Sequence, residues 1–134
     1  MIVDRATVVI TAAAPDVEAF LLRPRNLHRF LDGVPGSGPP IGDTAIRRGR
    51  WAFVADPGAH RFRWWLLAPY RAAGTLDVYG DCSHSQLWLT VAQAPATITR
   101  ADVHQAARAV LHRIRRCIEQ RQARQARPAF LRTA

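Results

Sequence analysis

The feature that most constrains the fold is a long stripe of apolar residues near the C-terminus. Its members recur at intervals of three, four, seven and eight positions, which is the spacing of one face of an α-helix. They are Val103, Ala106, Ala107, Val110, Leu111, Ile114, Cys117 and Ile118. Thr99 and Asp102 precede the stripe at the spacing of an N-terminal capping pair. A stripe of about four turns needs an apolar surface of equal length, so the rest of the chain must supply one.

Residues 44–93 supply that surface, because their apolar side chains alternate with polar ones, as in strands with one buried face. Residues 56–58 and 80–83 are typical of tight turns. We therefore expect antiparallel strands at about 44–54, 60–68, 71–80 and 84–93. The apolar face would carry Trp51, Phe53, Phe62, Trp64, Leu66, Leu76, Val78, Leu87, Leu89 and Val91. The polar face would carry Arg48, Arg50, Arg61, Arg63, Thr75, Asp77, Gln86 and Thr90, together with Trp65 and Trp88.

The N-terminal third predicts one strand and two short helices. Residues 5–11 are rich in β-branched side chains and favour a strand. Its buried face would carry Ala6, Val8 and Ile10. Pro15 favours the first position of a helix, where its missing N–H costs nothing, and Pro24 ends this helix and opens a second. Gly33 is typical of a helix end, and residues 33–43 are rich in Gly and Pro and indicate a loop.

The order of these elements is strand, two short helices, antiparallel strands and a long C-terminal helix. The most telling residues are Val8-Val9-Ile10, Ala14-Pro15 with Val17 and Phe20, Asn26-Leu27 with Phe30 and Val34, and the helix that begins at Thr99. In this order the chain resembles the START-like helix-grip superfamily, also called SRPBCC, which includes polyketide cyclase/dehydrase-like and lipid-transfer domains. The resemblance covers about residues 5–120. It implies an α+β fold in which a curved antiparallel sheet wraps around the C-terminal helix.

The resemblance also implies a cavity between the sheet and the helix. Such a cavity would bind a small hydrophobic or amphipathic ligand, for example a polyketide, an acyl chain or an isoprenoid. Small helix residues, Ala106 and Ala107, would leave room for a ligand or would let the tryptophans pack closely. The residues expected to bind the ligand are Trp51, Phe53, Trp64, Leu66, Leu76, Val78, Leu87, Leu89, Val103, Ala107, Val110, Leu111 and Ile114.

An enzyme of the polyketide cyclase/dehydratase type is the alternative, with one acid–base residue assisting in the same cavity. His28 and Arg50 are the catalytic candidates, although each also suits an exposed polar position. Asp81 and His84 could form a base with an orienting carboxylate, or could simply belong to a turn. The histidines and cysteines lack the spacing of a metal site, and the glycines in 33–43 lack that of a dinucleotide loop, so we expect no metal and no cofactor.

The net charge is +9, and every basic residue is an arginine. Arginines crowd the last quarter of the chain, which makes an RNA- or ribosome-associated module a further alternative. Trp65 and Trp88 could instead form a homodimer contact. We expect a cytoplasmic protein, because we find neither a secretory signal nor a stretch of about 20 apolar residues. One domain over residues 1–120 would be followed by a basic, solvated tail over 121–134.

Overall fold

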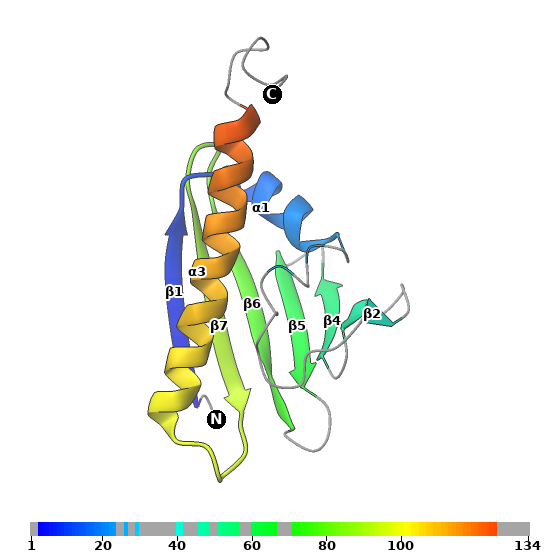
Figure 1. Cartoon of the computed structure of the whole chain (residues 1–134), viewed down its shortest axis with the longest axis vertical. Helices are drawn as coiled ribbons and strands as arrows, with labels where there is room; N and C mark the ends of the chain where they lie inside the picture. The colour runs from blue at the N-terminus through cyan, green and yellow to red at the C-terminus, as the bar shows by residue number, and fades with distance from the viewer. Residues whose placement is uncertain are drawn as a thin grey trace.

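The computed structural model describes residues 3–23, 26, 29, 40–41, 46–48, 51–56, 60–66 and 71–125, of which 40–41, 46–48 and 51 are described by their backbone alone. The strands are β1 (Asp4–Ile10), β2 (Pro40–Ile41), β3 (Ile46–Arg48), β4 (Trp51–Asp56), β5 (Arg61–Leu66), β6 (Ala72–Gly80) and β7 (Ser85–Gln93). The helices are α1 (Ala14–Leu21) and α3 (Arg100–Gln125). Figure 1 shows the long α3 lying along one face of the sheet. The expected α+β class is confirmed.

The seven described strands form one antiparallel sheet in the order β1-β7-β6-β5-β4-β3-β2. Strands β3 to β7 follow one another as a meander, and the first strand of the chain then pairs with the last. The register aligns apolar residues across the sheet in rows, such as Ala6, Leu89, Leu76 and Phe62. Because paired residues lie on the same face, this alignment gives one apolar face, which we call the inner face.

Helix α3 packs on the inner face over β1 and β7 (Figure 1). Its buried side chains are Ala107, Val110, Leu111, Ile114 and Ile118. These belong to the apolar stripe, so the prediction that the stripe meets the apolar face of the meander is confirmed. The predicted cap is also present, because the Thr99 hydroxyl accepts a hydrogen bond from the Asp102 N–H at 3.1 Å.

Helix α1 covers a different part of the inner face and contacts β6. Pro15 lies in its first turn, one position later than predicted because the helix begins at Ala14, and Val17, Phe20 and Leu21 are buried. The side chain of Asn26 donates a hydrogen bond of 2.8 Å to the Phe20 carbonyl oxygen, and this buried contact satisfies a carbonyl near the end of the helix.

A close approach on the inner face requires a glycine. Gly74 pairs with Trp64, and a Cβ at Gly74 would collide with the Thr90 carbonyl oxygen and come within 2.7 Å of the Trp64 indole. The register between β6 and β7 also shifts at Ala73 and Gly74. Gly74 therefore leaves room for the Trp64 indole beside the Thr90 carbonyl.

Three expectations from the sequence need correction or extension. The single strand expected at 44–54 is wrong: β3 and β4 are separate strands, and Arg48 pairs with Trp51. Because paired residues lie on the same face, Arg48 and Trp51 are not on opposite faces, as the alternation had predicted. The loop expected at 33–43 contains the short β2. Helix α3 continues to Gln125, beyond the expected start of the tail. Most of the expected second short helix lies outside the described residues.

Candidate ligand-binding site

The inner face is a continuous apolar surface. The sheet residues expected to bind a ligand that are buried there are Phe53, Trp64, Leu66, Leu76, Val78, Leu87 and Leu89. From α3, Ala107, Val110, Leu111 and Ile114 are buried and Val103 is half-buried. All of these except Leu66 belong to or pack against one hydrophobic cluster. The side chain of Trp51 lies outside the described residues.

Helix α3 covers only part of this surface. It packs on β1 and β7, whereas the buried aromatic residues come from strands farther along the sheet, Phe53 from β4 and Phe62 and Trp64 from β5. The aromatic half of the inner face therefore lies beside α3 rather than beneath it.

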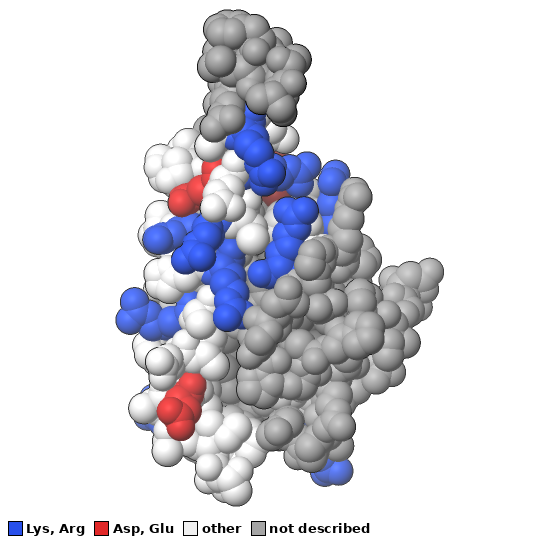
Figure 2. All heavy atoms as spheres, viewed as in Figure 1, with Lys and Arg blue, Asp and Glu red and all other residues white. Residues whose placement is uncertain are grey.

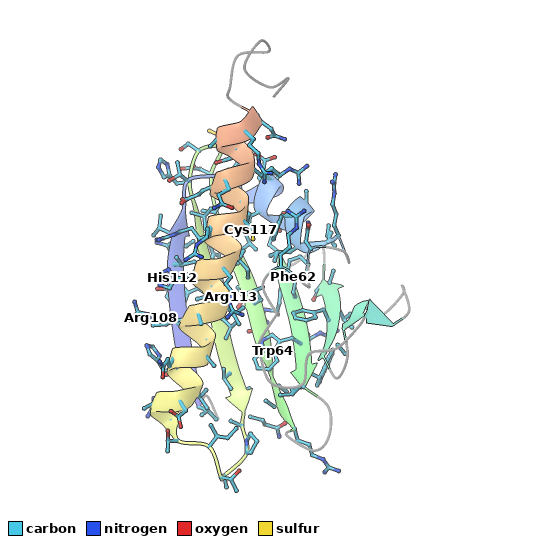
Figure 3. The ribbon with its side chains drawn as sticks, in the orientation of Figure 1. Phe62, Trp64, Arg108, His112, Arg113 and Cys117 are labelled. Carbon is cyan, nitrogen blue, oxygen red and sulfur yellow. The ribbon has the colours of Figure 1, made fainter. Side chains whose placement is uncertain are left out.

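The side of α3 that borders this aromatic half is not purely apolar. Figure 3 shows Arg113 and Cys117 on the side of the helix toward Phe62 and Trp64, and both are half-buried. Ala106 precedes Arg113 by two helical turns and so lies on the same side, where it is exposed. A small side chain, a thiol and a cation thus line this border of α3.

Polar contacts fix α3 to β1 at both ends. Near the start of the helix, His104 Nδ1 lies 2.7 Å from Asp4 Oδ2 at the start of β1. Near its end, Glu119 Oε2 accepts a hydrogen bond of 3.1 Å from the N–H of Thr11, directly after β1. Polar contacts, as well as apolar burial, therefore fix the position of α3 beside the aromatic half.

Comparison of the fold with solved structures finds close matches at low sequence identity. An aromatase/cyclase, ZhuI from Streptomyces sp. R1128, matches with a TM-score of 0.62 and 17% identity over 88% of this chain and 93% of that one. A protein from Chromobacterium violaceum matches with a TM-score of 0.66 and 16% identity, covering 87% of this chain and 96% of that one. The fold is the START-like helix grip.

A further helix-grip structure, the two-domain aromatase/cyclase StfQ of the steffimycin biosynthetic pathway, matches with a TM-score of 0.65 and 14% identity. The match covers 91% of this chain and 47% of StfQ. Comparison of the sequence with protein-family models and with curated proteins finds no match. The structural likeness thus establishes the fold, as the resemblance in the sequence implied.

The catalytic candidates His28 and Arg50 lie outside the described residues of this helix-grip chain. Asp81 and His84 are described, and they form a turn. Asp81 Oδ1 accepts hydrogen bonds from the N–H groups of Ser83 and His84, at 2.8 and 3.0 Å, and from the Ser83 hydroxyl. These donors lower the pKa of Asp81 to about 2. The carboxylate is thus engaged by the turn itself.

The described part of the chain has no group of three or more His, Cys, Asp or Glu residues that could hold a metal ion. No described helix has the length and hydropathy needed to cross a membrane. Arginines gather on the solvent-facing side of α3 (Figure 2), and among them Arg108, Arg116 and Arg124 are exposed.

The face of the sheet opposite α3, which we call the outer face, carries most of the polar residues predicted for it: Arg61, Arg63, Thr75, Asp77, Gln86 and Thr90. Arg48 pairs with Trp51 and so does not belong to it, and Arg50 lies outside the described residues. Trp65 and Trp88 lie there, as the alternation predicted, Trp65 exposed and Trp88 half-buried. The sequence analysis placed Arg61 and Trp88 on this face, but it did not show that Arg5 and Tyr79 lie beside Trp88. The strand order shows it, because β7, which carries Trp88, lies between β1, which carries Arg5, and β6, which carries Tyr79.

Proposed function

We propose that this chain binds a small hydrophobic or amphipathic molecule, of the polyketide, acyl or isoprenoid type, between the inner face and α3. The observation that carries the proposal is that the buried aromatic half of the inner face, Phe53, Phe62 and Trp64, lies beside the strands on which α3 packs. A ligand there would meet aromatic rings on one side and a helix on the other. Two solved structures with this fold are named as aromatase/cyclases, which is consistent with such a ligand.

The border of α3 favours an amphipathic ligand over a purely apolar one. Ala106 offers room, and Arg113 and Cys117 are half-buried on the same side. The Arg113 guanidinium would attract the polar end of such a ligand, for example a carboxylate or an enolate oxygen. The apolar part would then lie toward Phe62 and Trp64.

A fluorescent binding assay tests the proposal. The uncharged dye N-phenyl-1-naphthylamine gains fluorescence in apolar surroundings, and dodecanoate should displace it from the chain. Ala106→Trp should abolish the dye signal, because the indole would fill the border beside the aromatic half. Ala107→Trp is a poorer probe, since Ala107 is buried in the stripe of α3 and overpacking there destabilises the fold.

Ala101→Trp is the matched control for Ala106→Trp. Ala101 is exposed in the first turns of α3 and lies three turns before His112, on the side of the helix away from Phe62. It should leave dye binding unchanged. Equal binding by the wild type and Ala106→Trp, or no binding by a wild type that is folded, would contradict the proposal.

An enzyme of the cyclase/dehydratase type is a second candidate, favoured by the names of the two aromatase/cyclases. In that case His28 or Arg50 would act on a ligand already held at the inner face. His28→Ala and Arg50→Ala should then keep dye binding and lose turnover of a polyketide substrate. If the wild type leaves a panel of polyketide and acyl substrates unchanged, binding without catalysis is the better account.

RNA binding is a third candidate, favoured by the exposed arginines of α3 (Figure 2). The interaction would be with phosphates, so its affinity should fall steeply as salt is raised. Charge reversal by Arg115→Glu and Arg116→Glu should weaken it further. Absence of RNA binding at low salt would remove this candidate.

A further inference from the structure

The outer face of the sheet has a hollow of its own. Both described helices lie on the inner face, and the three exposed large apolar side chains of the described strands, Val9, Trp65 and Tyr79, all lie on the outer face. Here the sheet is hollowed by about 410 Å³, within the range of small-molecule sites. Thr90 and Asp77, both short, lie on neighbouring strands among the larger side chains that line the hollow.

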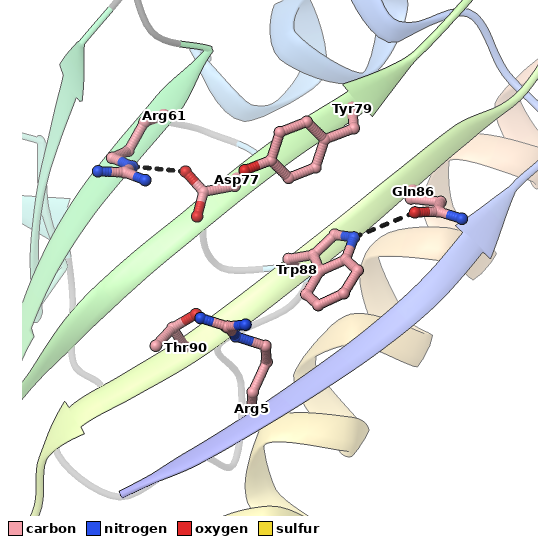
Figure 4. A pocket seen from close by; sticks show the side chains of 7 residues that line it. All are labelled: Arg5, Arg61, Asp77, Tyr79, Gln86, Trp88 and Thr90. Carbon is pink, nitrogen blue, oxygen red and sulfur yellow. Dashed lines mark hydrogen bonds and ion pairs between the residues drawn. The ribbon is translucent and has the colours of Figure 1, made fainter. Parts of the chain in front are cut away.

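The side chains around the hollow hold one another in place. Arg5 donates through Nε to the Thr90 hydroxyl at 3.3 Å, and its guanidinium lies 5.4 Å from the centroid of the Trp88 ring. Trp88 donates through Nε1 to Gln86 Oε1 at 3.2 Å and meets the ring of Tyr79 edge to face, with centroids 6.3 Å apart. Figure 4 shows these groups on one region of the sheet. A site whose walls are already ordered loses little entropy when a ligand binds.

The charges in the hollow do not cancel. Arg61 Nε lies 2.6 Å from Asp77 Oδ1, and this pairing raises the pKa of the Arg61 guanidinium. The two opposite charges of this ion pair offset each other. Among the described residues, no carboxylate forms an ion pair with Arg5. Arg5 therefore gives the hollow one positive charge in excess, and its terminal nitrogens can donate to an anion.

We propose that this hollow binds a small planar aromatic acid, with its ring beside those of Trp88 and Tyr79 and its carboxylate on Arg5. The aromatic pair favours a flat ring over a flexible chain. The single excess charge favours a monoanion over a neutral molecule or a polyanion. This site lies across the sheet from the inner face and does not depend on a ligand there.

Proton–nitrogen NMR spectra of the full ¹⁵N-labelled chain test the proposal, with 2-naphthoate as the probe. Titration should shift the indole Nε1–H signal of Trp88, assigned by its loss in Trp88→Phe, in a saturable way. The uncharged 2-naphthamide should bind more weakly. Arg5→Gln should weaken naphthoate binding by about tenfold, the effect of losing one hydrogen bond to a charged group.

Three variants make the result specific. Arg108→Gln removes the same charge from an exposed position on α3 and should leave naphthoate affinity unchanged. Arg5→Lys keeps the charge and should retain more affinity than Arg5→Gln. Signals of the other residues that do not change will show that both variants fold. Ala106→Trp, which should block the inner site, should not affect the shift of Trp88.

Four results would overturn the proposal. Equal affinities of Arg5→Gln and Arg108→Gln would show that Arg5 does not hold the carboxylate. A dimer in sedimentation velocity that Arg5→Gln abolishes would assign the outer face to a second copy of the chain. Tighter binding of single-stranded oligouridylate, in competition with naphthoate, would assign it to nucleic acid. An unmoved Trp88 signal would show that the hollow is not a site for such an acid.

Discussion

The packing of α3 on the inner face predicts a large loss of stability from Ile114→Ala. Ile114 is 0% exposed at the centre of the apolar stripe. The substitution removes three carbons, worth about 2.4 kcal/mol at ~0.8 kcal/mol each. The cavity left behind adds to this loss, and measured costs of such substitutions are about 2–5 kcal/mol. We therefore expect the free energy of unfolding to fall by about 3–4 kcal/mol, a large part of the ~5–15 kcal/mol typical of a domain.

Urea unfolding followed by circular dichroism and by tryptophan fluorescence measures this loss. Ile98→Ala is the matched control, because it deletes the same atoms from a side chain that is 39% exposed just before α3. It should cost no more than about 1 kcal/mol. A cost for Ile114→Ala no greater than that for Ile98→Ala would refute the argument that this face of α3 is bound to the sheet.

Substitutions at three further positions test other parts of the structure by the same unfolding assay. Gly74→Ala should destabilise the chain by about 1–3 kcal/mol, because a Cβ would meet the Thr90 carbonyl and the Trp64 indole; unchanged stability would count against this close approach. Thr99→Ala should cost about 1 kcal/mol through loss of the cap on α3, whereas Thr99→Ser should restore most of it. Asp81 has a pKa lowered to about 2 in the folded chain, so its carboxylate stabilises the fold above about pH 4 and loses that contribution as the pH falls through 2. Asp81→Asn should therefore lower the urea midpoint at neutral pH, and a gap from the wild type that does not narrow between pH 4 and 2 would contradict this reasoning.

The elements with a strong local pattern could be predicted from the sequence. The stripe from Val103 to Ile118 and the cap at Thr99 identified α3, and the alternation in 84–93 identified β7 with its buried face. These patterns are reliable because a long helix stripe and a half-buried strand each repeat one physical requirement many times.

The region around β3 and β4 shows where local pattern fails. Alternation continued across Gly49 and Arg50, so two paired strands looked like one. The Gly-X pair at 49–50, a known hairpin signal, could have shown the reversal. Strand β2, only two residues long, has too few positions for any periodicity.

The outer hollow could not be predicted from spacing along the chain. Arg5, Arg61 and Trp88 are far apart in sequence and meet only because β7 and β6 lie between β1 and β5. Alternation can assign a residue to a face, but the neighbours on that face depend on strand order and register.

Methyl NMR of the ¹³C-labelled chain with dodecanoate bound tests the central claim most directly. If the ligand lies between the inner face and the border of α3, nuclear Overhauser effects should join it to the methyl groups of Leu76 and Val110. Effects confined to outer-face methyls such as that of Thr90, or a saturated sample with no effect at Leu76 and Val110, would contradict the account.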